Sequence, residues 1–88
     1  MKNQVKTLID RIEINPRILV GKPVIKGTRI SVEQIMRMLA SGMNEGEILD
    51  QFGHIKKEDI QAAILYASEL VQDLHAYPRQ FINQIKIR

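Results

Sequence analysis

The sequence predicts a mainly α-helical fold: a tri-helical unit with a helix-turn-helix, preceded by a short N-terminal β-arm. A turn-rich segment over about residues 11–30 begins with isoleucines on alternate positions, which is typical of a short strand. Two short amphipathic patterns follow at about 32–41 and 44–52, and a longer apolar helical pattern covers about 57–74. These three observations predict one domain over residues 1–78 and a separate tail over 79–88.

The β-arm is predicted from its turn residues. Asn15-Pro16 is a turn signal, and Ile18–Val20 reads as a second short extended run. Gly21-Lys22-Pro23 and Lys26-Gly27-Thr28 are expected to turn the chain on either side of Val24-Ile25. The arm has too few apolar side chains for a core of its own, so we expect it to pack on the helices.

The first two helices carry terminal signals. Ser31 and Gln34 form the S-x-x-Q pattern of a capping box, and Gly42 is expected to end the first helix in a left-handed conformation. Asn44 is expected to cap the second helix, with Glu47 at its third position.

The third helix is predicted to be the hub of the core. Its expected packing face consists of apolar residues at helical spacing, namely Ile60, Ala63, Ile64, Ala67, Leu70, Val71 and Leu74. Further apolar residues widen this surface beyond one stripe, so a subunit contact is left open. The turn at Gly53–Ile55 between the last two helices suits a helix-turn-helix.

Composition excludes several classes of protein. The chain has no cysteine, which rules out disulfides, thiolate zinc sites and cysteine nucleophiles, and which fits a cytoplasmic location. No apolar run approaches the roughly 20 residues of a membrane span, and the start lacks the apolar core of a signal peptide.

Charge is distributed unevenly along the chain. Residues 1–30 contain seven Lys or Arg and two Asp or Glu, whereas residues 31–75 contain three and eight. Residues 76–88 are basic again, with three Lys or Arg and no acid. We therefore expect a polyanion to meet the two ends of the chain first.

The sequence offers no complete catalytic or metal site. His54 and His75 have no second His or Cys at the spacing of metal ligands. Among the acidic residues, Glu47 is interpreted as a helix-capping residue, and Glu45 and Asp50 as part of a solvated face. The loop is no Walker motif, since Gly27 is followed by Thr28. We expect a protein that is not an enzyme and that uses no cofactor or metal; a small hydrolase or nuclease is the least favoured hypothesis.

Two sets of residues are candidates for DNA contact. A helix-turn-helix would read DNA with the start of its last helix, where Lys56, Lys57 and Gln61 are suitable and Glu58 and Asp59 are unfavourable. The basic residues of the arm, Lys22, Lys26 and Arg29, are better placed for phosphate. For Arg29, a structural salt bridge to an acidic helical residue is the favoured interpretation, with phosphate contact as the alternative.

Residues Ile12 to Ala67 resemble a small prokaryotic family, Domain of Unknown Function 433 (DUF433). The family pattern G-[KR]-P-x-[IV]-x-G-[TS]-R-[IV]-x-V is matched by Gly21-Lys22-Pro23-Val24-Ile25-Lys26-Gly27-Thr28-Arg29-Ile30-Ser31-Val32. The chain departs from the family where Lys56 is a poor cap residue and where the proline near Gly53 is missing.

The resemblance implies a homeodomain-like fold and an antitoxin of a type II toxin–antitoxin pair. Such a protein neutralises a PIN-like ribonuclease toxin by direct contact, and it commonly binds the DNA of its own operator. A homodimer is expected, and the alternative is a stand-alone dimeric DNA-binding regulator. The alternating tail is the candidate toxin-binding segment, through Phe81, Ile82, Ile85 and Ile87.

Overall fold

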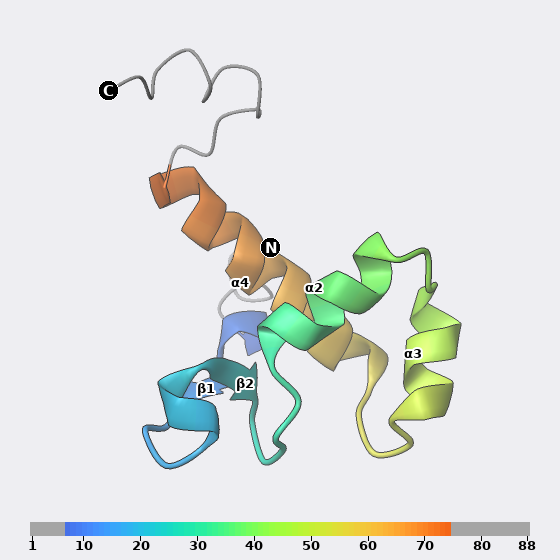
Figure 1. Cartoon of the computed structure of the whole chain (residues 1–88), viewed down its shortest axis with the longest axis horizontal. Coiled ribbons are helices and arrows are strands. Elements are labelled where there is room, and N and C mark those ends of the chain that lie inside the picture. The colour runs from blue at the N-terminus through green and yellow to red at the C-terminus, as the bar shows by residue number, and fades with distance from the viewer. Residues whose placement is uncertain (1–6, 75–88) are drawn as a thin grey trace.

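The computed structural model describes residues 7–74, and it confirms a mainly helical fold with a two-stranded hairpin before the helices (Figure 1). The elements are β1 (Ile12–Ile14), the 3-10 turn η1 (Leu19–Gly21), β2 (Pro23–Ile25), α2 (Val32–Ala40), α3 (Glu45–Gln51) and α4 (Lys57–Leu74). A short helical turn at residues 7–9 precedes them. The candidate tail residues 79–88 and His75 lie outside the described residues.

The two strands of the β-arm pair antiparallel, with Ile12 opposite Ile25 and Ile14 opposite Pro23. Since Ile14 and Pro23 are direct partners, residues 15–22 must form the loop that reverses the chain between the two strands. They do so through consecutive left-handed residues: Leu19, Val20 and Gly21 have φ values of 50°, 55° and 82°. The predicted extended run at Ile18–Val20 is therefore wrong.

The second predicted turn of the arm is confirmed, and Thr28 holds it together. The Thr28 hydroxyl donates to the carbonyl oxygen of Ile25 at 2.8 Å and accepts from the amide of Ile30 at 3.0 Å. The Thr28 amide also donates to Ile25, at 2.9 Å, while Gly27 adopts a φ of 81°. These bonds fix the turn that leads from β2 into α2.

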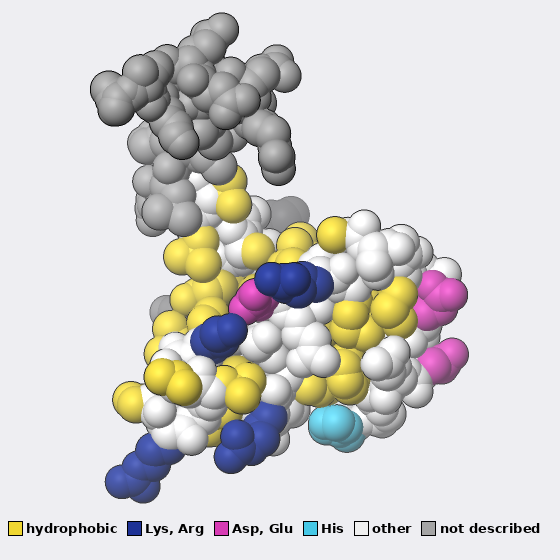
Figure 2. Space-filling view, in the orientation of Figure 1, with side chains coloured by type: hydrophobic (Ala, Val, Ile, Leu, Met, Phe, Trp, Pro, Cys, Tyr) yellow, Lys and Arg dark blue, Asp and Glu magenta, His cyan; other side chains and the backbone are white. Residues whose placement is uncertain are grey.

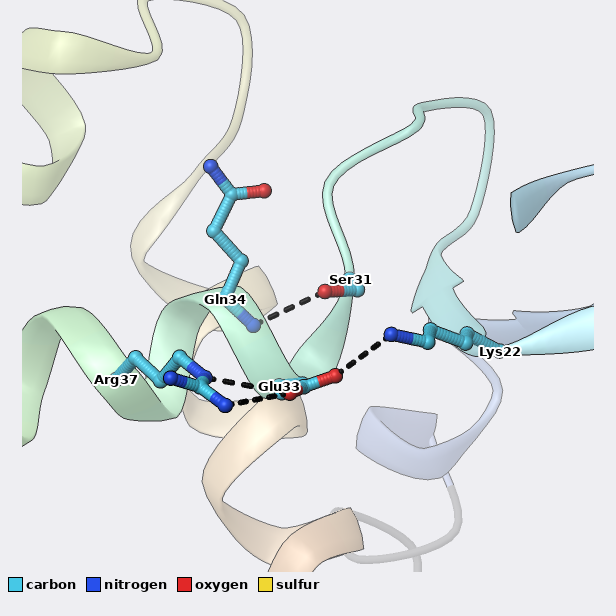
Figure 3. Close-up of polar contacts among 5 residues, drawn as sticks. All are labelled: Lys22, Ser31, Glu33, Gln34 and Arg37. Carbon is cyan, nitrogen blue, oxygen red and sulfur yellow. Dashed lines mark hydrogen bonds and ion pairs between the residues drawn. The ribbon is translucent and has the colours of Figure 1, made fainter. Parts of the chain in front are cut away.

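The observed helix termini agree closely with the capping signals in the sequence. Ser31 Oγ accepts from the amide of Gln34 at 2.9 Å, but the Gln34 side chain extends away from Ser31, so this predicted capping box is half formed (Figure 3). The box between Asn44 and Glu47 is complete, with both bonds at 2.8 Å. Gly42, with φ of 103°, ends α2 as predicted.

The core lies where α4 crosses α2, and α3 and β1 also pack against α4. The residues of the buried cluster come from the arm, all three helices and the α3–α4 turn: Ile25, Ile30, Val32, Ile35, Ile48, Ile55, Ile60 and Ala63. Ala62 is buried as well. The prediction that α4 is the hub is thus confirmed for its first half.

The second half of α4 extends beyond this core (Figure 1). Ile64, Leu70 and Val71, which were predicted for the packing face, are 42%, 44% and 53% exposed. That part of the prediction is wrong: Leu70 and Val71 lie in the part of α4 beyond the core, and Ile64, in the first half, lies on a side of the helix that the core does not cover. Among the described residues, no helix combines the length and hydropathy that crossing a membrane requires.

Candidate nucleic-acid interface

On the face shown in Figure 2, basic side chains lie over the β-arm and the adjoining part of α2 with one acidic side chain between them, and further acidic side chains lie on the α3 side. This separation follows from the sequence, because the arm belongs to the basic first third of the chain and α3 to the acidic middle. A polyanion would therefore be attracted to the arm side of the described surface.

Lys26 and Arg29 occupy the tight turn between β2 and α2, and both are exposed. Within residues 7–74, neither side chain takes part in an ion pair. The salt bridge favoured for Arg29 is therefore not formed in this part of the chain. Both cations are left facing solvent on a backbone that Thr28 holds in place.

The ion pair that ties the arm to a helix is made by Arg11 instead. Its Nη1 lies 3.0 Å from Oδ1 of Asp59, whose side chain is only 12% exposed. The other carboxylate oxygen, Oδ2, accepts from the amide of Lys56 at 2.8 Å. Asp59 thus supplies from within the first turn the α4 cap that Lys56 lacks.

This arrangement corrects the charge assessment of α4. Asp59 was expected to meet phosphate unfavourably, but its carboxylate is drawn into the protein and neutralised by Arg11. Sequence reasoning missed the pair because its members are 48 positions apart. Only the antiparallel pairing of the arm and its packing on α4 bring them together.

The same bonds place the start of α4 beside the tight turn. The amide of Lys26 donates to the carbonyl oxygen of Arg11 at 2.8 Å, so three successive contacts link the turn to Lys56. Figure 1 shows this turn and the α3–α4 turn at the same edge of the molecule. The candidate residues at the start of α4 are exposed, namely Lys56, Lys57 and Gln61. Glu58 is the exposed acid among them.

Lys22, the remaining candidate of the arm, is engaged with α2 (Figure 3). Its Nζ lies 2.9 Å from Oε1 of Glu33, and Arg37 holds the other oxygen of the same carboxylate through Nη2 at 3.0 Å and Nε at 3.2 Å. The hydrogen bond from Lys22, followed by that from Arg37, lowers the pKa of Glu33 below its usual 4.5. Arg37 was not a candidate from the sequence, although its position four residues after Glu33 is a pairing signal.

Among the described residues, the acidic side chains of α3 do not form a metal site. Glu47 is used in the capping box with Asn44, as predicted. Across residues 7–74, no three His, Asp or Glu side chains converge as they would around a metal ion.

The comparisons agree with the resemblance seen in the sequence. The family model described as "Protein of unknown function (DUF433)" matches residues 12–67, well over half of the chain. A crystal structure of a DUF433 member protein from Anabaena variabilis ATCC 29413, at 2.00 Å resolution, is similar to this one with a TM-score of 0.69. The two chains are 27% identical, and the match covers 84% of this chain and 73% of that one. No curated protein matches. On the extent of the family match, this chain belongs to the DUF433 family.

Proposed function

We infer that this protein is a non-enzymatic, antitoxin-like partner of a PIN-like ribonuclease toxin, and that it also binds operator DNA. The observation that carries the DNA-binding half is the tight turn with Lys26 and Arg29. The Thr28 hydroxyl and the amide of Ile30 are used by the fold, whereas these two cations are exposed and unpaired within the described chain.

Physical considerations favour phosphate as the ligand of this turn. Contacts to phosphate supply most of the sequence-independent affinity of DNA-binding proteins, and they need cations held at fixed positions. The bonds of Thr28 fix the turn, and the Arg11–Asp59 pair fixes it against α4. Lys56, Lys57 and Gln61 at the start of α4 would extend the contact surface along the same edge.

Binding as a function of salt concentration tests this proposal. The probe is a labelled duplex from immediately upstream of the protein's own coding sequence, and the variants are Lys26→Ala, Arg29→Ala and Arg17→Ala. Each of the first two should weaken binding and reduce the slope of log K against log salt by about 0.9, the value for one phosphate contact.

Arg17→Ala is the charge-matched control. Arg17 lies in the loop at the opposite end of the β1–β2 hairpin, and it is also exposed. Its removal should leave the slope unchanged. Equal slopes for all three variants and the wild-type protein would show that the tight turn does not touch the DNA.

The toxin-binding half of the proposal is supported by the family resemblance and by the pattern of the tail. Within residues 79–88, the last four, Ile85-Lys86-Ile87-Arg88, alternate apolar and polar side chains, which suits addition of a strand to a partner or insertion into a groove. Deletion of residues 79–88 should release toxin activity when the two proteins are expressed together. Full neutralisation by the shortened chain would remove the tail from the mechanism.

A second candidate function is a stand-alone dimeric regulator, which the exposed apolar residues of α4 favour. Ile64 and Val71 are separated by two helical turns and Leu70 lies beside them, so a partner helix could cover all three. Val71→Glu should then convert a dimer to a monomer in light scattering and weaken operator binding. A wild-type protein that is monomeric at every concentration and bound to its toxin would exclude this candidate.

A further inference from the structure

We propose that Lys22 and Arg37 form a second phosphate-binding site for the nucleic-acid backbone, and that Glu33 occupies this site in the free protein. The inference rests on the proposed DNA binding and deepens it. It assigns a role to Arg37, which neither the sequence pattern nor the helix-turn-helix geometry indicates.

The geometry of the bound carboxylate is the first argument. Two donors from different elements converge on Glu33: Lys22, which precedes β2, takes one oxygen, and Arg37 on α2 takes the other with two nitrogens (Figure 3). A phosphodiester, like a carboxylate, presents two charged oxygens on one central atom. The donors that now hold Glu33 can therefore hold a phosphate in the same place.

The second argument is that Glu33 is readily displaced. The side chains of Lys22, Glu33 and Arg37 are 57%, 48% and 78% exposed, so exchange buries no charge and opens no cavity. Exposed ion pairs contribute little to stability and are screened by salt. A duplex, in contrast, gains from the release of its condensed counterions when cations replace them.

The third argument is the spacing of the two sites. Lys22 lies four residues before Lys26 along β2, which corresponds to roughly 13 Å of extended chain. Each strand of a duplex carries a phosphate about every 3.4 Å along its axis, so one duplex can reach both the tight turn and the Lys22–Arg37 pair. The two sites would then act on a single DNA molecule.

The test compares Glu33→Gln with Glu45→Gln. Both substitutions remove one negative charge, but Glu45, on α3, holds no cation within the described chain. Binding to a generic labelled duplex is measured by fluorescence anisotropy at several salt concentrations. Glu33→Gln should raise the affinity about three-fold or more over Glu45→Gln at low salt, and it should steepen the salt slope by about 1 to 2, since two cations are freed.

A double variant locates the effect. Adding Arg37→Ala to Glu33→Gln should remove about half of the gain in salt slope, because the guanidinium is then absent while Lys22 stays free. If Glu33→Gln and Glu45→Gln bind equally well, the inference is wrong.

The two proposals fail in different ways. If Lys26→Ala and Arg29→Ala weaken binding while Glu33→Gln behaves like Glu45→Gln, DNA binding stands and only the second site is lost. If neither the wild-type protein nor any variant binds a duplex, both are overturned. Thermal melting of every variant confirms that the fold is retained.

Discussion

Replacement of Val20 by glycine should stabilise the protein, although glycine usually weakens folded structure. Val20 has φ of 55° and ψ of 37°, in the left-handed region where a Cβ crowds the following carbonyl group. Its side chain is 94% exposed, so its removal gives up almost no buried apolar surface. The native contacts therefore offer little reason for valine at this position.

The size of the effect follows from two opposing terms. The left-handed conformation costs an L-residue about 1–2 kcal/mol, and glycine avoids this cost. Glycine in turn loses about 0.5–1 kcal/mol through the greater freedom of the unfolded chain. The midpoints of the two ranges leave a net gain of about 0.75 kcal/mol in the free energy of unfolding, which for a domain of this size raises Tm by roughly 3–6 °C.

Thermal melting of three variants isolates the conformational term. Val20→Gly should melt above the wild-type protein, whereas Val20→Ala, which keeps a Cβ in the left-handed region, should gain less. Val24→Gly should melt well below it, since Val24 is fully buried in β2. A Val20→Gly protein that melts below Val20→Ala would refute the argument, because it would show that the backbone there is not strained.

Three further predictions concern the contacts described above. Asp59→Ala removes both the α4 cap and the partner of Arg11, so the free energy of unfolding in urea should fall by about 1–3 kcal/mol. Asp59→Asn keeps an acceptor for the cap and should lose less, and equal losses would contradict the capping role. NMR titration of Glu33 should give a pKa below 4.5 that rises toward that value in Arg37→Ala, and an unmoved pKa would contradict the pairing. Because the folded-state pKa is lowered, the stabilisation by this network is present above about pH 4.5 and is lost as the pH falls through the lowered pKa. Ile48→Ala empties a fully buried site and should cost about 2–5 kcal/mol in denaturant unfolding, while a loss below about 1 kcal/mol would place Ile48 outside the core.

The helices were predictable because their signals are local. Asn44 and Glu47 form their capping box within one turn, and Gly42 ends α2 by its own conformation. The predicted range of 57–74 for the last helix agrees with α4 as observed. The register of the hairpin was not predictable, because it depends on the conformation of the loop formed by residues 15–22. No local sequence pattern indicates that Leu19 and Val20 adopt left-handed conformations.

In the candidate interface, too, features with local signals were predictable and features that depend on tertiary packing were not. Exposure of Lys26 and Lys57 follows from composition and turn position, since charged residues in turns and first helical turns rarely become buried. The neutralisation of Asp59 by Arg11 depends on how the arm packs against α4, which a single sequence does not encode in any short pattern. Sequence reasoning therefore overestimated the repulsion between the start of α4 and a polyanion.

The most direct test of the antitoxin proposal is a purification of the tagged full chain from its native host, with and without nuclease treatment. The proposal predicts that a PIN-like ribonuclease co-purifies in a stoichiometric amount, and that the complex survives removal of DNA. Recovery of DNA alone, with no protein partner in either preparation, would contradict it and would favour the stand-alone regulator.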